Sequence, residues 1–285
     1  MSLQPSSCSA ASLDAGEPLA GTASRADTIL LVEVRGAWER DVLDAPGRLG
    51  TSVTGRLRSW VEERVRAKVL FVRRPDRRAG DVLAFVVRAA GGPPSIRRFA
   101  LSRHDELAEL DLDGGGELVA EPIALVCGHG RRDPCCARLG TPVFDALRDM
   151  LGPEELWLSS HQGGHRFAPN LLWLPEGFAF GRVAPATAQA LVAELRAGRL
   201  PTASLRGRIT LAPEAQAAEI AARDALGLEG IADAKVVEAA PGLVRLATAA
   251  GPLDVGVASE PGPPVPASCG AEPEPTVRYT ATVVR

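Results

Sequence analysis

The sequence has no long apolar run and no excess of basic residues. No stretch reaches the roughly 18 consecutive apolar residues that a membrane-spanning helix needs. The first residues, MSLQPSSCSAASLDAGEPLAGTAS, lack the basic and apolar segments of a signal peptide. The net charge of −3 gives no basic field that would attract nucleic acid or anionic lipid. We therefore expect a cytoplasmic protein that binds neither a membrane nor nucleic acid.

Cysteine is also scarce, but its distribution is uneven. The chain has five cysteines, too few and too unevenly placed for a disulfide framework in a reducing cytosol. Three of them, together with three of the four histidines, fall within one short stretch; these residues are Cys127, His129, Cys135, Cys136, His161 and His165. Such clustering indicates metal or redox chemistry rather than packing.

Hydrophobic periodicity predicts two successive runs of the same elements. In the first run we expect a strand at 28–34, a helix at 52–67 and a second strand at 68–74. A strand pair at 81–89 and 95–101 follows, and a short helix closes the run by residue 110. In the second run we expect the same succession over 122–127, 136–151, 155–160, the hairpin 170–183 and the helix 184–200. This β–α–β–β–β–α order is thioredoxin-like and suggests an internal duplication, although such an order also arises by chance in α/β chains.

The two runs and the two ends of the chain give four predicted units. We expect a flexible N-terminal segment over 1–27, a thioredoxin-like half without ligands over 28–120 and a second thioredoxin-like half, which holds the candidate ligands, over 121–203. A small α+β domain should occupy 204–285, with a strand at RITL, a helix at 213–226 and four further strands. A Pro-rich loop, EPGPPVPASCGAEPEP, interrupts those strands. This last unit has no histidine and one cysteine, so we expect no metal site of its own there.

The clustered cysteines lie at the junction of a strand and a helix. Cys127 ends a predicted strand, and Cys135 and Cys136 lie where the next helix begins. The first turn of a helix offers free N–H groups and a partial positive charge, both of which stabilise a thiolate. Adjacent helical side chains point about 100° apart, so the two neighbouring cysteines cannot both reach one metal atom.

The histidines follow the next strand of the same parallel pair. His161 directly follows that strand, and Gly163-Gly164 allows a tight reversal that returns His165 to the same side. Because parallel strands end at the same edge of a sheet, two cysteines and two histidines should meet there. Two Cys and two His complete a tetrahedral metal site or bind a [2Fe–2S] cluster.

Two further residues of this segment are candidates for supporting the site. His129, between two glycines, should be a hydrogen-bond partner of the site, with a role as a spare ligand as the alternative. Asp133 could hold an imidazole or the loop backbone.

The sequence here resembles a known family. The pattern C-x-H-G-x-R-D-x-C-C, followed by H-x-G-G-H-R-F-A-x-N and a hairpin that ends in F-G-R-V, is similar to the sucrase/ferredoxin-like family. The resemblance runs from Pro18 onward and is most specific over 125–183. It implies a thioredoxin-like ferredoxin domain over 121–203, preceded by a degenerate thioredoxin-like repeat.

The resemblance also implies a cofactor, a [2Fe–2S] cluster. Its ligands would be Cys127, His161, His165 and one of the two adjacent cysteines. Cys136 is preferred because its spacing from Cys127 fits the family and because it begins the inward face of the helix. Cys135 should then face more toward solvent.

The implied function is that of an iron–sulfur electron carrier or reductase module, acting with a redox partner protein. Two alternatives remain: a structural zinc site built from the same Cys2His2 residues, and a metal-free thiol–disulfide oxidoreductase. The latter lacks a C-x-x-C motif and leaves the two histidines unexplained. No paired carboxylates are placed for the glycoside hydrolysis that the family name suggests.

Overall fold

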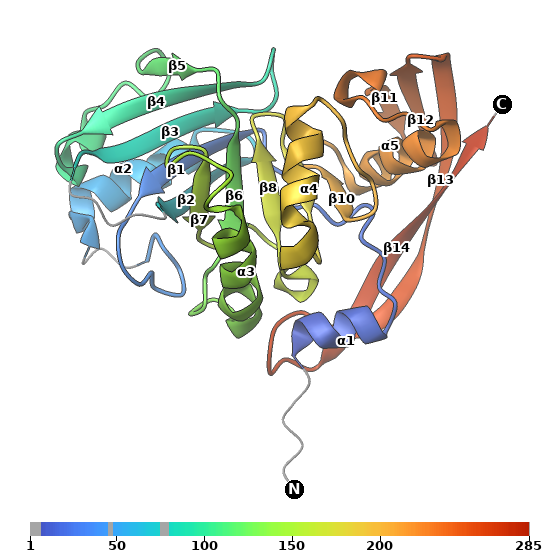
Figure 1. The fold of residues 1–285 in the computed structure, drawn as a ribbon, viewed down its shortest axis with the longest axis horizontal. Helices are drawn as coiled ribbons and strands as arrows, with labels where there is room; N and C mark the ends of the chain where they lie inside the picture. The colour runs from blue at the N-terminus through green and yellow to red at the C-terminus, as the bar shows by residue number, and fades with distance from the viewer. Residues whose placement is uncertain (1–6, 45–47, 75–79, 285) are drawn as a thin grey trace, which may run out of the picture.

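The structure is a computed structural model that describes residues 7–44, 48–74 and 80–284. In this part of the chain, ten strands form one sheet in the order β10-β9-β8-β6-β7-β2-β1-β3-β4-β5 (Figure 1). Their bounds are β1 (Thr28–Glu33), β2 (Ala67–Arg73), β3 (Val82–Arg88), β4 (Ser95–Leu101), β5 (Glu117–Val119), β6 (Ile123–Cys127), β7 (Leu156–Ser159), β8 (Leu171–Leu174), β9 (Phe178–Phe180) and β10 (Leu205–Arg208). Four α-helices accompany it: α1 (Cys8–Asp14), α2 (Gly50–Glu62), α3 (Pro134–Leu147) and α4 (Pro185–Arg196).

The large sheet contains the same strand order twice. β2-β1-β3-β4 in one half corresponds to β7-β6-β8-β9 in the other, and the first two strands of each half run parallel around one helix. The halves meet edge to edge where β2 pairs antiparallel with β7, with Val72 opposite Ser159. Each half therefore has the thioredoxin-like order, and the predicted α/β fold class is confirmed. The repeated order also supports the proposed duplication.

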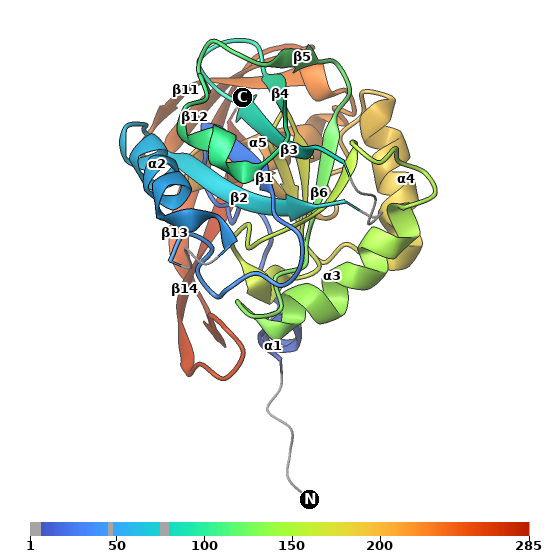
Figure 2. The same cartoon turned by 90° about the vertical axis from the view of Figure 1, so that its left-hand side faces the viewer.

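Alternate residues of the strands face two different cores. Val126 of β6 packs under α3 and α4, whereas Leu125 faces the opposite side. Leu125 shares that side with Leu31 of the other half, in one core that runs across both halves. At its centre Phe85 and Trp157 meet edge to face, with ring centroids 5.4 Å apart. α2 covers one half of the sheet and α3 and α4 cover the other (Figure 2). Because the shared core covers the opposite face, the strands that end beneath α3 are buried on both faces.

The C-terminal residues form a second sheet against α5 (Pro213–Leu226). The described strands of this sheet are antiparallel and run in the order β11 (Ala234–Ala240), β12 (Leu243–Thr248), β13 (Gly251–Pro266) and β14 (Pro273–Val284). The prediction that a Pro-rich loop interrupts these strands is wrong. β13 and β14 continue through that segment as a long hairpin, with Pro261 opposite Val277. Proline is tolerated there because these strands reach beyond the body of the sheet.

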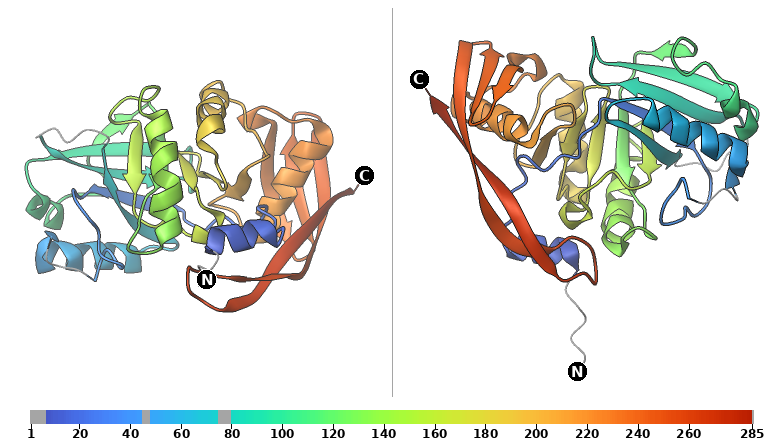
Figure 3. Two further views of the ribbon diagram at one scale, coloured as in Figure 1. Left: turned by 60° about the horizontal axis from the view of Figure 1, so that its bottom comes forward. Right: turned by 180° about the vertical axis from the view of Figure 1, so that it is seen from behind.

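The N-terminal segment is not simply flexible, as the sequence suggested. Residues 1–6 lie outside the described residues, but Cys8–Asp14 forms α1, which is capped by the Ser7 hydroxyl. α1 lies beside the far end of the β13–β14 hairpin (Figure 3). The strand expected at RITL is also misplaced, because β10 ends at Arg208 and pairs with β9 in the large sheet. None of the helices in the described ranges is both long and apolar enough to cross a membrane.

Gly140 sets how closely α3 approaches β6. A Cβ at this position would lie 2.1 Å from the carbonyl oxygen of Cys127, so no side chain fits without moving the helix. We expect Gly140→Ala to destabilise the fold by about 1–3 kcal/mol, the usual cost of overpacking.

The matched control is Gly55→Ala in α2, where a Cβ meets nothing within 4 Å. There the better helix propensity should stabilise by about 0.5–1 kcal/mol. Denaturant unfolding measures the change in the free energy of unfolding for both variants. Equal changes in the two variants would contradict the prediction, because they would show that α3 can move away from β6 at little cost.

Lys68 is half-buried near the fully buried Arg206. Burial, and then the charge of Arg206, lowers the pKa of Lys68 from 10.5 to about 8. The unfolded chain therefore binds more protons than the folded one between these values, and stability should rise with pH across that window. We expect Lys68→Met to stabilise the protein at pH 7 by about 1–3 kcal/mol, with the gain shrinking by pH 10. Thermal unfolding at both pH values checks this, with Lys235→Met on exposed β11 as the control; a gain that does not depend on pH would contradict it.

Candidate metal centre

Three predicted site residues meet at the carboxyl ends of β6 and β7. Cys127 is the last residue of β6, Cys136 lies in the first turn of α3, and His161 follows β7. One donor atom from each lies within 4.8 Å of the others, and both cysteines are fully buried. We call these three residues the first donor group. They converge because β6 and β7 are parallel and end at one edge, while Asp133 caps α3 directly above it.

The pKa values of the two thiols in the first donor group are shifted in opposite directions. Hydrogen bonding from the Cys136 thiol, and then from the His161 imidazole, holds the pKa of Cys127 well below its ordinary value despite burial. The same hydrogen bond to Cys127, together with burial, raises the pKa of Cys136. Of the two thiols, Cys127 is therefore the one that loses its proton more readily, as a soft metal ligand must.

His129 supports the first donor group through both of its ring nitrogens. Its Nε2 lies 2.8 Å from the carbonyl oxygen of Glu39, and its Nδ1 accepts the backbone N–H of His161 at 3.2 Å. Its ring also meets that of Trp38 edge to face. With both nitrogens engaged, His129 holds the backbone of His161 in place. In contrast, Nδ1 of His161 is buried and has no hydrogen-bond partner among the described residues.

The loop after His161 is held by a residue that the sequence analysis missed. Gly163 and Gly164 have φ values of +104° and +72°, and this backbone reversal precedes a short 3-10 helix that begins at His165. The buried Arg206 donates to the carbonyl oxygen of Gly163 at 3.1 Å and to Oδ1 of Asn170 at 2.9 Å. Burial lowers the pKa of Arg206 to about 9, so it is cationic at neutral pH. A side chain at Gly164 would collide with Arg206, which explains the glycine.

His165 lies beside the first donor group rather than within it. Its ring centroid is 5.0 Å from that of His161, but its Nδ1 lies 3.3 Å from Oδ2 of Asp133 and 3.8 Å from Sγ of Cys8. Burial lowers the pKa of His165, and the nearby carboxylate of Asp133 opposes that shift. Asp133 thus contacts an imidazole and also accepts the backbone N–H of Cys135, the two contacts suggested for it.

The expectation that Cys135 faces solvent is wrong. Cys135 is buried, and its Sγ lies 3.7 Å from that of Cys8 and 3.2 Å from that of Cys269. With Asp133, these three cysteines form a second set of donors within 4.8 Å of one another, which we call the second donor group. Cys8 and Cys269 have no role predicted from the sequence. Both are far from Cys135 in the sequence, and no motif around either residue indicates a metal site.

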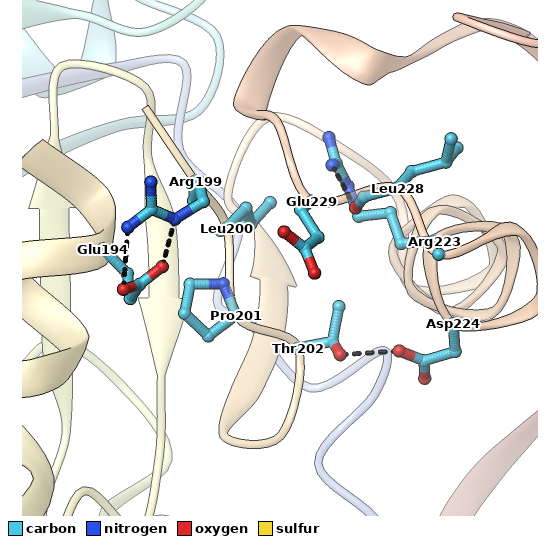
Figure 4. A pocket seen from close by; sticks show the side chains of 10 residues that line it. Glu194, Arg199, Leu200, Pro201, Thr202, Arg223, Asp224, Leu228 and Glu229 are labelled. Carbon is cyan, nitrogen blue, oxygen red and sulfur yellow. Dashed lines mark hydrogen bonds and ion pairs between the residues drawn. The ribbon is translucent and has the colours of Figure 1, made fainter. Parts of the chain in front are cut away.

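A cleft of about 480 Å³ lies elsewhere, between the end of α4 and α5 (Figure 4). Its polar walls are paired with one another: Glu194 binds Arg199, and Thr202 binds Asp224. The residues lining this cleft include no cysteine or histidine, so it is separate in chemistry from the donor groups.

Curated relatives match one stretch of this chain. "Altered inheritance of mitochondria protein 32" from Saccharomyces kudriavzevii is 30% identical over 109 residues, which is 34% of this chain and 35% of that protein. The protein of the same name from Eremothecium gossypii is 33% identical over 102 residues, 31% of this chain and 33% of its own length. The chain thus spans about a third of the length of the curated relatives it matches.

A solved structure also matches part of the chain. The Cys59Ser variant of the thioredoxin-like [2Fe-2S] ferredoxin from Aquifex aeolicus has a TM-score of 0.25 and 19% identity, over 30% of this chain and 96% of its own.

The predicted function, a [2Fe–2S] electron carrier or reductase module, is wrong by these comparisons. The curated relatives carry the name of a mitochondrial inheritance protein, and that name describes no electron carrier. The cofactor prediction is confirmed only at a coarser level, since the chain holds cysteine groups that could bind a metal. The redox partner and the cytoplasmic location stay predictions.

The family model described as sucrase/ferredoxin-like matches residues 19–207, which include the first donor group, His165 and both halves of the large sheet. Because this match covers well over half of the sequence, the chain belongs to the sucrase/ferredoxin-like family.

Proposed function

We propose that this chain is a metal-binding protein. Its centre lies at the first donor group, with Cys127, Cys136 and His161 as ligands and His165 as the fourth. The occupant that these donors fit best is a [2Fe–2S] cluster, since two thiolates and two imidazoles are a known ligand set for it. A bound centre would join the end of β6, the first turn of α3 and the loop after β7.

The observation that carries the proposal is the unpaired nitrogen of His161. Its Nδ1 is buried without a hydrogen-bond partner among the described residues. A buried polar atom without a partner costs about 1–3 kcal/mol, so such atoms are rare unless a ligand or water satisfies them. Because this nitrogen belongs to a residue grouped with two buried sulfurs, a metal that favours sulfur and nitrogen donors would supply the missing partner.

The contact between Asp133 and His165 supports the fourth ligand. A metal-binding histidine usually donates the N–H of its other nitrogen to a carboxylate, which fixes the ring and its tautomer. Nδ1 of His165 lies 3.3 Å from Oδ2 of Asp133, so Nε2 is the nitrogen left for the metal. His165 lies outside the 4.8 Å group of the other three donors. This wider spread favours two irons over a single zinc ion, whose tetrahedral ligands lie within about 4 Å of one another.

We expect protein isolated without air to contain about two irons and two sulfides per chain, as a [2Fe–2S] cluster requires. Cys136→Ser and His161→Ala should lose most of the iron and the visible absorption, because each removes a ligand. Cys135→Ser is the matched control: it changes the adjacent buried thiol in the same helical turn and should keep the iron. Iron and sulfide analysis with visible spectroscopy measures all three.

Two results would count against this proposal. If iron persists in Cys136→Ser but disappears in Cys135→Ser, the proposed ligands are wrong. Zinc without sulfide at the first donor group would reject the cluster and leave only the coarser proposal of metal binding.

A further inference from the structure

The second donor group brings together three distant parts of the chain. Cys8 comes from α1, Cys135 from the first turn of α3, and Cys269 from the connection between β13 and β14. Their sulfur atoms form a triangle with sides of 3.7, 3.2 and 3.6 Å. Figure 3 shows α1 and the end of the hairpin side by side, away from the small C-terminal sheet.

The size of this triangle matches a zinc site better than a disulfide. Four ligands around zinc with Zn–S bonds of about 2.3 Å place their sulfurs about 3.8 Å apart, within a few tenths of an ångström of two of the three sides. A disulfide needs about 2.05 Å and would leave the third thiol unpaired. We propose that Cys8, Cys135, Cys269 and Asp133 bind a zinc ion, a second metal site distinct from the first donor group.

Asp133 completes the tetrahedron. Its Oδ1 lies 3.3 Å from Sγ of Cys269 and 3.7 Å from Sγ of Cys8, on the same scale as the distances between the sulfurs. The backbone N–H groups of Cys135 and Cys269 each donate to this carboxylate at 2.8 Å and fix its orientation. Zinc accepts carboxylate oxygen as well as thiolate. As the ion binds, the three thiols release their protons to solvent.

The packing around α1 shows why a metal would be useful there. A helix of seven residues is not stable by itself. The apolar cluster at this point has only Cys8, Cys135 and Ala168 as buried members among the described residues, with Leu139 and Cys269 partly buried beside them. So small a core supplies little hydrophobic stabilisation, and small cores of this kind are usually reinforced by a disulfide or a metal.

The test compares two adjacent cysteines in the full chain. Reduced protein with its metals removed is given Zn²⁺ alone, dialysed, and analysed for zinc. We expect about one zinc per chain from the second donor group, in addition to any ion that the first group takes up. Cys135→Ser and Cys269→Ser should each bind about one zinc fewer than the wild type. Cys136→Ser, the matched control, changes only the first donor group, so adding Cys135→Ser to it should remove one further zinc.

A second measurement does not depend on the variants folding. Co²⁺ bound by three thiolates absorbs strongly in the visible and near-ultraviolet, and Zn²⁺ should displace it from the wild type. Amide hydrogen exchange in α1 and in the end of the hairpin should slow on adding Zn²⁺, while exchange in the C-terminal sheet stays unchanged.

Several outcomes would overturn the second site. Zinc content unaffected by both Cys135→Ser and Cys269→Ser is one, and a native disulfide among the three thiols is another. Iron content at the first donor group is measured separately, so an empty first site would contradict the proposed function without touching this one.

Discussion

The buried carboxylate of Asp133 accepts hydrogen bonds from three different parts of the chain. One comes from the N–H of Cys135 at the start of α3, one from the N–H of Cys269 in the C-terminal hairpin, and one from the thiol of Cys8 in α1 at 3.7 Å. Nδ1 of His165 also lies 3.3 Å from the carboxylate. Burial would raise the pKa of Asp133, but the two backbone N–H groups and His165 outweigh it, and the pKa lies below its ordinary value. Asp133 is therefore a carboxylate at neutral pH. The start of α3, the orientation of His165 and the position of the hairpin all depend on that one charge.

The antiparallel pairing of β2 with β7 holds the two halves of the large sheet together. Each thioredoxin-like half would expose β2 or β7 as an unpaired edge, and joining the two removes both edges at once. Ser160 directly follows β7 and makes two hydrogen bonds with Phe71 of β2. Its hydroxyl accepts the N–H of Phe71 at 2.9 Å, and its own N–H donates to the carbonyl oxygen of Phe71 at 2.7 Å. The ligand-free half thus holds the strand end from which His161 emerges. This gives the first half a role in the site although it contributes no donor to it.

Local patterns in the sequence were enough to predict much of this arrangement. Strand and helix periodicity predicts the two β–α–β–β–β–α runs, and the parallel order of β6 and β7 then brings Cys127, Cys136 and His161 together. What the sequence could not indicate depends on contacts between distant segments. Cys8 and Cys269 are separated by 261 residues, and no local signal says that α1 and the hairpin meet. For the same reason Cys135 was expected in solvent, because the partners that bury it lie at the two ends of the chain.

The adjacent pair Cys135 and Cys136 shows how one helical turn can serve two different groups. Neighbouring helical residues point about 100° apart, so two adjacent thiols on one turn cannot converge on one atom. In this chain Cys136 points to Cys127 beneath the helix, and Cys135 points to Cys8 and Cys269 at its side. Both are near the free N–H groups of the first turn, which favour negative charge there. The C-C dipeptide therefore indicates two donor groups that share one helix N-terminus, and His165, with Asp133 on one side and His161 on the other, lies where these groups meet.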